Sequence, residues 1–392
     1  GKIMNVKNVK EMKKVIEREF ENKNFDYIRK LGIVRKNIYG IDIQPIATEI
    51  SRLRCFLTLI VDESIHDELE NRGIEPLPNL DFKFVTANSL IGLPKVSVNN
   101  QAGLFEDRNG IEELKELREM FFNASGLDRE KLKLKFKQVQ DRMFEKIIET
   151  KRGGIADLTG SLTTWDPFGH KASTWFDSEW MFGIKEGFGI VIGNPPYIAS
   201  YGRQAKDFLK ENIRYYIDKY ETFSSVSNRK NISINTIMLF LERGLSLTQN
   251  SGILSYIIDQ AFLNVDVYFY SRKFLINNYT LQEIVTDLKF PQIIAEACVL
   301  RIIKKKSERE YNFFWRKKNV NSPLKGVSIL EINKDDYQFI LSSNLNINKK
   351  IEQKSTTLGE CAETSTGMQI IPQYFLSNDE NVLKSPKWHK AV

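Results

Sequence analysis

The sequence predicts an α/β fold with a doubly wound sheet, and three observations lead to this class. Short apolar runs alternate with segments whose apolar residues recur every three or four positions, as strands and helices do in such sheets. The run at residues 189–193 is rich in β-branched side chains, as in a strand that is buried on both faces. Polar residues follow several of the expected strands directly, at the edge where open α/β sheets bind their ligands.

The composition is that of a globular protein with a basic surface. The chain has 392 residues, of which 42% are hydrophobic and 27% charged, enough for one large domain or two. A net charge of +7 suits a polyanionic partner without identifying one. The 3 cysteines are far apart, which argues against a disulfide framework and for a reducing, cytoplasmic location. No His/Cys spacing predicts a metal site, and no apolar run is long enough to span a membrane.

Two strands with polar tips are expected before the β-branched run. Residues 37–45 predict a short strand that ends at Asp42, after which Pro45 opens a helix at a first-turn position. Residues 81–90 predict a second strand with Asn88 at its tip. Asp42 either accepts hydrogen bonds from ribose hydroxyls or caps the following helix. Asn88 either contacts the adenine of a nucleotide or belongs to an ordinary turn.

Helical and aromatic segments surround these strands. Residues 1–36 are charged and helical in pattern, and residues 111–151 predict two amphipathic helices that we interpret as an insertion packed on the sheet domain. Residues 152–188 are rich in Trp and Phe, which we expect to cover the sheet. Residues 200–231 mix cations with aromatic rings, and they either hold a DNA backbone or form an ordinary amphipathic helix.

The second half of the chain continues the alternation of helix and strand. A helix is expected at residues 234–247, and a turn at residues 250–252 leads into a strand at residues 253–258. Another helix and strand follow, and a final strand is expected at residues 297–303. Residues 312–355 are polar and mixed, and we interpret them as a connector with some local order.

The β-branched run leads into Asn194-Pro195-Pro196-Tyr197, the most distinctive stretch of the chain. The Asn194 amide offers one acceptor oxygen and two donors. The two prolines fix φ and remove two N–H groups, so two backbone carbonyls stay free of local competition. Tyr197 adds a flat ring, so a purine amine such as adenine N6 fits this platform. The alternative is a Pro-Pro turn that ends a strand beside a core tyrosine.

These four residues resemble motif IV of the amino-methylating DNA methyltransferases, in the Asn form of the N6-adenine group. Residues 38–63 and 85–90 resemble motifs II and III, and residues 251–260 resemble motif VI. Together they resemble the gamma-class N6-adenine DNA methyltransferases of the type IIG restriction-modification and phage-defence group. The resemblance implies a Rossmann-like class I fold that uses S-adenosylmethionine and acts on double-stranded DNA.

The resemblance also implies roles for individual residues. Catalysis would lie with Asn194, Pro195, Pro196 and Tyr197, where the Asn194 side chain and the Pro195 carbonyl orient and activate adenine N6. Tyr197 and Phe290 would stack on the flipped base, which must leave the duplex for N6 to be reached. Asp42, Ile43 and Asn88 would hold the cofactor. No metal is needed in this chemistry.

One part of the family pattern is not found, and it shapes the expected domain organisation. The Asp/Glu-Pro-x-x-Gly-x-Gly loop of motif I should lie several dozen residues before Asp42, and it is not in this sequence. We therefore expect an internal piece of a longer protein, with restriction or defence-system domains or subunits outside this chain. The expected division is a catalytic domain at residues 1–310 without the central motif I strand, with the helical insertion at about 110–151. A connector at 311–360 and the start of a target-recognition domain at 361–392 follow.

Two other functions fit the same residues. A protein-glutamine methyltransferase uses a similar Asn-Pro-Pro-Tyr to hold a side-chain amide, but those enzymes are short and lack a long helical insertion. A catalytically silent DNA-binding module would keep the fold, although the loss of Asn194 or Tyr197 would be expected there. We find no acid-acid-Lys cluster typical of a nuclease.

Overall fold

The computed structural model describes most of the chain between residues 25 and 341. The described residues are 25–61, 67–68, 72, 78–93, 108–150, 165–169, 171–197, 212–227, 235–291, 296–306, 310–318, 324–332, 337–339 and 341. The chain divides into the units Gly1–Phe339 and Ile340–Val392, and every helix and strand given below lies in the first unit. None of the described helices combines the length and apolar character needed to cross a membrane. The predicted region 361–392 lies outside the described residues.

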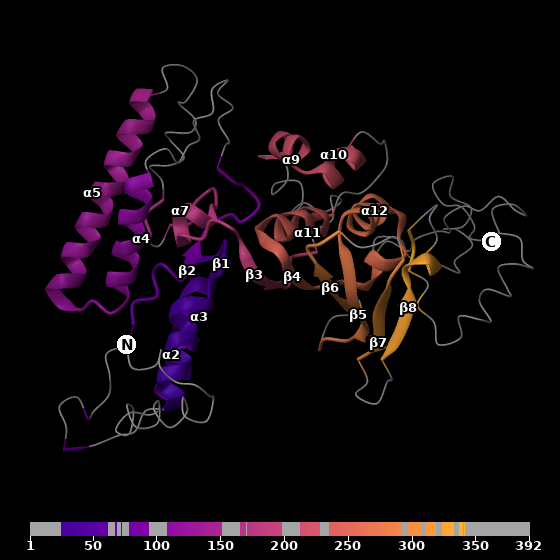
Figure 1. Cartoon of the computed structure of the whole chain (residues 1–392), viewed down its shortest axis with the longest axis horizontal. Coiled ribbons are helices and arrows are strands. Elements are labelled where there is room, and N and C mark those ends of the chain that lie inside the picture. The colour runs from indigo at the N-terminus through magenta and orange to yellow at the C-terminus, as the bar shows by residue number, and fades with distance from the viewer. Residues whose placement is uncertain are drawn as a thin grey trace, which may run out of the picture. The chain divides into compact units, whose positions relative to one another are not determined.

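A two-stranded parallel sheet forms from the first two predicted strands. It consists of β1 (Gly40–Asp42) and β2 (Phe84–Thr86), with Asp42 opposite Thr86. Helix α3 (Pro45–Ile60) begins with Pro45 as predicted and packs on both strands. Helix α2 (Phe25–Asn37) precedes β1, and Figure 1 shows these elements together in indigo.

A six-stranded mixed sheet contains the remaining strands, in the order β3-β4-β6-β5-β7-β8. The pair β3–β4 is parallel and β6 is antiparallel to both of its neighbours. Helix α11 packs on β3 and β4, and α12 packs on β5 (Figure 1). The α/β class is thereby confirmed. The bounds are β3 (Phe188–Gly193), β4 (Thr248–Asp259), β5 (Thr280–Leu288), β6 (Ala297–Ile303), β7 (Asn312–Lys317), β8 (Lys325–Ser328), α11 (Thr236–Leu247) and α12 (Phe269–Asn278).

The prediction that β3 is buried on both faces is wrong for the described part of the chain. β3 ends the sheet, where β4 is its neighbour on one side and no described strand pairs on the other. The side chains of Ile190 and Ile192 are 67% and 76% exposed. The β-branched run therefore predicted a strand correctly. Whether that strand is buried depends on the other segments that pack against it.

The sheet extends into the segment that we interpreted as a connector. β7 pairs in parallel with β5, and β8 pairs with β7, so residues 312–328 add two strands to the sheet. The expected turn at residues 250–252 also lies within β4 and not before it. Ser251 has a φ of 62°, and the pairing of β3 with β4 shifts register beside it, so the turn residues form an irregularity in a continuous strand.

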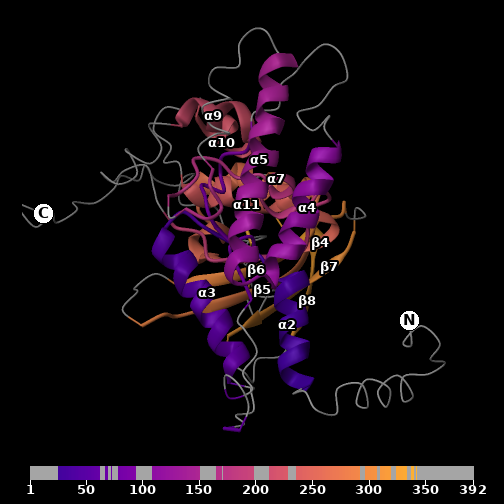
Figure 2. The same ribbon diagram turned by 90° about the vertical axis from the view of Figure 1, so that its left-hand side faces the viewer.

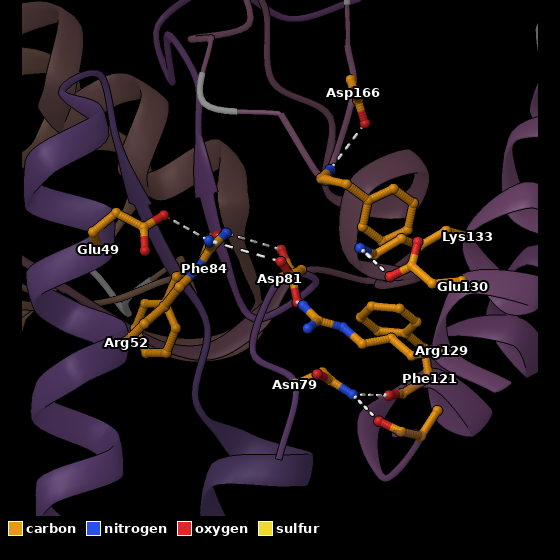
Figure 3. Close-up of polar contacts among 12 residues, drawn as sticks. Glu49, Arg52, Asn79, Asp81, Phe84, Phe121, Arg129, Glu130, Lys133 and Asp166 are labelled. Atoms are coloured by element: carbon orange, nitrogen blue, oxygen red, sulfur yellow. Dashed lines mark hydrogen bonds and ion pairs between the residues drawn. The ribbon is translucent and has the colours of Figure 1, made fainter. Parts of the chain in front are cut away.

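The predicted helical insertion is a hairpin of α4 (Arg108–Phe122) and α5 (Gly126–Thr150), side by side in Figures 1 and 2. Figure 3 shows how polar contacts fix it to the residues before β2. Asn79 donates to the Phe121 carbonyl over 2.7 Å and to a second carbonyl of the hairpin turn over 2.6 Å. Asp81 lies between Arg52 of α3 at 3.9 Å and Arg129 of α5 at 3.5 Å. The hairpin is thus tied to the first sheet by both apolar and charged contacts.

The aromatic residues are mostly core, as predicted for residues 152–188. Trp165, Trp175 and Trp180 are buried with Phe121 and Phe136 of the hairpin in one apolar cluster. Short helices connect these parts of the chain: α7 (Ser178–Phe182), α9 (Ile213–Lys219), α10 (Glu221–Ser227), and the 3-10 helices η3 (Gln260–Leu263), η4 (Asp266–Tyr268) and η5 (Ile329–Glu331).

Candidate functional site

The Asn-Pro-Pro-Tyr stretch begins immediately after β3. The Tyr197 hydroxyl lies 3.0 Å from Asn194 Oδ1 and 3.1 Å from the Ile257 carbonyl of β4, so it can donate its proton to either oxygen. Burial, with smaller contributions from Cys298 and Asp259, raises the pKa of Tyr197 to about 12. The hydroxyl therefore stays protonated at neutral pH and remains a donor. Asn194 Oδ1 is an exposed acceptor that already receives a donor from a flat ring.

The two prolines differ in their surroundings. Pro195 is buried, whereas the Pro196 carbonyl accepts a hydrogen bond from the Thr236 hydroxyl at the start of α11. This does not contradict the expectation of carbonyls free of local competition, because the partner of Pro196 comes from a distant part of the chain. The partner lies 40 residues downstream, and no local pattern around Thr236 signals this contact.

Strand directions place Phe290 at the same edge of the sheet. β3 and β4 are parallel, β6 is antiparallel to β4, and β5 is antiparallel to β6, so β3, β4 and β5 point the same way. Phe290 follows β5 by two residues, and its ring is 37% exposed. Tyr197 is 36% exposed. Within the described part of the chain these two rings do not contact each other. A base bound between them would therefore have to contact each ring separately.

Asp42 and Asn88 lie at neighbouring strand tips of the two-stranded sheet. The Asp42 carbonyl accepts from the Ala87 N–H over 2.9 Å, which brings the two tips together. One Asp42 carboxylate oxygen accepts from the Gln44 N–H over 2.8 Å, and Asn88 Oδ1 accepts from the Leu90 N–H over 3.1 Å. Asn88 therefore makes the local turn contact that was one of its alternatives. Asp42 instead accepts from the N–H of Gln44, the N-cap residue of α3, and no side chain caps this helix, so the alternative that Asp42 caps it is wrong. The Asp42 carboxylate and the Ile43 side chain are nevertheless exposed, so they remain accessible to a ligand.

Helix α11 makes hydrogen bonds to both groups of candidate residues. Its first residue, Thr236, binds the Pro196 carbonyl, and two turns later Arg243 Nε donates to the Ser89 carbonyl over 2.7 Å. Arg243 Nη2 also donates to the Phe176 carbonyl over 2.9 Å. The motif after β3 and the turn after β2 are thus held to one rigid element. Sequence reasoning did not find Thr236 or Arg243, because neither belongs to a recognisable motif.

Part of the basic, aromatic segment at residues 200–231 is structural. Tyr216 and Phe223 are fully buried in a small apolar cluster, and the buried Tyr220 hydroxyl donates to the Leu90 carbonyl. The Tyr215 hydroxyl accepts from the Gly92 N–H over 2.7 Å. These rings support the turn after Asn88, so an ordinary amphipathic segment is the correct interpretation for them. Residues 200–211 lie outside the described part.

Comparison with known proteins then decides the family. The model of the Eco57I restriction-modification methylases matches residues 36–290, more than half of the chain. The chain belongs to this family. The matched range includes every candidate site residue from Asp42 to Phe290, so the predicted resemblance to methyltransferases of restriction-modification systems is confirmed. Among the described residues, no group of three or more His, Cys, Asp and Glu side chains is placed to hold a metal ion.

Individual relatives are longer than this chain. A protein of Methanocaldococcus jannaschii named "Putative type II restriction enzyme and methyltransferase" is 24% identical over 373 residues, which cover 79% of this chain and 30% of the relative. A type II restriction enzyme and methyltransferase of Escherichia coli is 25% identical over 130 residues, 32% of this chain and 12% of the relative. Among solved structures, the type IIG restriction endonuclease BpuSI matches with a TM-score of 0.36 at 12% identity, covering 84% of this chain and 33% of that one.

Proposed function

We propose that this chain provides the base-binding part of a DNA adenine-N6 methyltransferase that uses S-adenosylmethionine in a restriction-modification or phage-defence system. The observation that supports this most is the position of Asn194 Oδ1. It is exposed beside the Tyr197 ring, directly after β3, and a hydroxyl donor already lies 3.0 Å away. A purine amine likewise presents a hydrogen-bond donor attached to a flat ring, as the Tyr197 hydroxyl does.

The proposed roles of the motif residues follow from their chemistry. Asn194 Oδ1 and the Pro195 carbonyl accept the two N6 hydrogens of a flipped adenine, which leaves the nitrogen lone pair free to act as the nucleophile. The Tyr197 ring stacks on the base, and its hydroxyl transfers its hydrogen bond to the Ile257 carbonyl, which is already 3.1 Å away. Phe290 covers the other side of the base from the end of β5. Positioning dominates such a direct displacement.

Asp42, Ile43 and Asn88 are the proposed cofactor contacts. Asp42 uses one oxygen for its turn, so the carboxylate retains acceptor capacity for ribose hydroxyls. The Ile43 side chain is 49% exposed beside it and offers an apolar surface to a purine ring. The Asn88 amide nitrogen is a donor that suits an acceptor on adenine. S-adenosylmethionine, when bound, supplies the electrophilic methyl group.

The two sheets have unpaired edges where a motif I strand would fit. Among the described strands, β1 pairs with β2 alone and β3 pairs with β4 alone. The exposed face of α3 is apolar, with Ile46 64% and Leu53 54% exposed. These apolar surfaces support the interpretation of a partial catalytic domain, although its sheet continues past the expected bound at residue 310 through β7 and β8. We therefore propose that methyl transfer requires a longer parent protein that supplies such a strand. The matched parts of this chain span only 30% and 12% of the two relatives.

The test uses that parent protein with unmethylated DNA and methyl-labelled S-adenosylmethionine, followed by digestion to nucleosides. We expect label in N6-methyladenine, and we expect Asn194→Ala to abolish it. The matched control is Asn278→Ala, the same change at an exposed position at the end of α12, which should keep full activity. Label in protein glutamine would favour the other methyltransferase, and no label in any product would favour a silent module.

A further inference from the structure

A small basic pocket lies at the end of the two-stranded sheet opposite to the candidate cofactor residues. Tyr39 and Lys83 line it, and each directly precedes a strand, β1 or β2. Because the strands are parallel, this end is the amino-terminal one, whereas Asp42 and Asn88 follow the carboxyl ends. The other charged residues of its lining are Arg35, Lys115, Arg118 and Glu119.

Arg118 of α4 is buried in the wall of this pocket, with only 8% of its surface exposed. Its Nη2 donates to the Trp180 carbonyl, but Nε and Nη1 have no hydrogen-bond acceptor among the described residues. The guanidinium carbon lies 5.9 Å from the ring centre of Phe82 and 5.6 Å from that of Phe136. These rings stabilise the charge weakly and accept no conventional hydrogen bond from it. Two of the three guanidinium nitrogens therefore remain as unused donors.

Lys83 is the second buried cation of the pocket and is also 8% exposed. Its Nζ lies 4.0 Å from the ring centre of Tyr39. Within the described ranges no carboxylate forms an ion pair with it. Burial, opposed by Glu119 and reinforced by Arg35, lowers the pKa of Lys83 to about 8, so the amine is still mostly charged at neutral pH. A buried charge of this kind is costly unless an anion accompanies it.

The other charges around the pocket are already paired. Arg35 Nη2 lies 3.0 Å from Glu119 Oε2, and Lys115 Nζ lies 2.9 Å from Glu112 Oε1. Each of these pairs has no net charge. The charge of the site therefore comes from Lys83 and Arg118, which together contribute two positive charges and at least three free donor groups.

We propose that Lys83 and Arg118 form a binding site for a phosphate group. A doubly charged tetrahedral oxyanion matches both the charge of the two side chains and their number of free donors, whereas a single carboxylate matches neither in full. The cavity of about 30 Å³ has room for roughly two water-sized groups.

Two sources can supply this group, and the experiment separates them. The phosphate is either a free inorganic ion or part of a DNA backbone that reaches the hairpin side of the sheet. The site is independent of the proposed methyl transfer, because its residues lie at the opposite strand ends from the motif residues. If phosphate does not bind at this site, the proposed methyltransferase function is unaffected.

The test measures binding of inorganic phosphate to the 392-residue chain by calorimetry, at constant ionic strength with chloride as the balancing ion. We expect saturable binding that Lys83→Met weakens at least tenfold. Lys133→Met is the matched control, because it makes the same change on helix α5, outside the pocket, and it should alter affinity less than twofold. No saturable binding to the unsubstituted chain, or equal affinity of the two variants, would overturn the proposal.

A second titration with a short DNA duplex identifies the source. If the group belongs to DNA, Lys83→Met weakens duplex binding more than Lys133→Met, and inorganic phosphate competes with the duplex. If it is a free ion, both variants bind the duplex alike while Lys83→Met alone loses phosphate. Circular dichroism of each variant verifies that it is folded.

Discussion

Replacing Lys83 by methionine should stabilise the folded chain in phosphate-free buffer at pH 7. Methionine keeps an unbranched apolar side chain of similar length, so packing beside Tyr39 is largely retained. The substitution removes a charge that only 8% of the residue surface exposes to water. If Lys83 serves anion binding and not stability, its replacement by an apolar residue is expected to raise stability.

The magnitude follows from the pKa of the amine. Burial lowers it from 10.5 to about 8, and each pH unit of difference corresponds to about 1.4 kcal/mol, so the buried charge costs about 3 kcal/mol. The substitution also removes the contact of Nζ with the Tyr39 ring, worth about 1 kcal/mol. We therefore expect Lys83→Met to raise the free energy of unfolding by about 2 kcal/mol.

The same reasoning gives a pH dependence with a definite sign. Between about pH 8 and pH 10.5 the unfolded chain holds a proton on Lys83 that the folded chain has released. Stability from this group therefore rises with pH across that window, and the cost of the charge is complete below it. The stability difference between Lys83→Met and the unsubstituted chain should shrink from pH 8 upward and vanish or reverse by pH 10.5.

Urea unfolding followed by circular dichroism at several pH values from 7 to 10.5 measures this difference. Lys133→Met again serves as the control, because the Lys133 side chain is partly exposed, at 26%, and already paired with Glu130, so its loss should change stability by under about 0.5 kcal/mol. If Lys83→Met is less stable than the unsubstituted chain at pH 7, or if the difference does not depend on pH, the burial argument is refuted.

Three further predictions concern the motif and the sheet. Tyr197→Phe keeps the ring but loses the bond to Asn194, so methylation by the parent protein should stay within about tenfold, whereas Tyr197→Ala should lower it by a further ~10–100-fold through lost stacking. Thr236→Val removes the hydrogen bond to the buried side of the Pro196 carbonyl and should cost about 1–2 kcal/mol in urea unfolding while lowering kcat more than it changes KM. Gly187→Ala should destabilise the chain by about 3 kcal/mol in the same assay, because Gly187 has a φ of 89° and a Cβ there would lie 2.6 Å from a backbone carbonyl oxygen. Unchanged unfolding in the last two variants, or equal activity of the two Tyr197 variants, would contradict these assignments.

The local sequence accounts for much of the fold. Pro45 opens α3, the β-branched residues before Gly193 form β3, and the apolar spacing of residues 111–151 predicts the helical hairpin. In each case the signal lies within one turn or one strand, where backbone preference and periodicity act directly. The motif residues Asn194 and Tyr197 were recognisable for the same reason.

Other features depended on contacts between distant parts of the chain. Strand β7 was missed because we assigned residues 312–355 together as polar and mixed, although Phe313, Phe314 and Trp315 form a strand-like aromatic run. The run itself carries no sign that its partner is β5. Asp42 and Asn88 left two alternatives open, since a turn contact and a ligand contact use the same side-chain oxygens. Only the tertiary structure shows which hydrogen bonds the Asp42 and Asn88 side chains make.

By itself the sequence determined the order of strands and helices as far as β6, the Asn-Pro-Pro-Tyr motif and the family resemblance. The tertiary structure decided that β3 lies at a sheet edge, that Thr236 and Arg243 tie two motifs to one helix, and that Lys83 and Arg118 share a pocket. The reason is that the burial of a side chain and the compensation of its charge depend on neighbours that come from distant parts of the chain. A lysine in an apolar strand pattern and an arginine on an amphipathic helix look ordinary until folding buries both, without an ion-pair partner among the described residues.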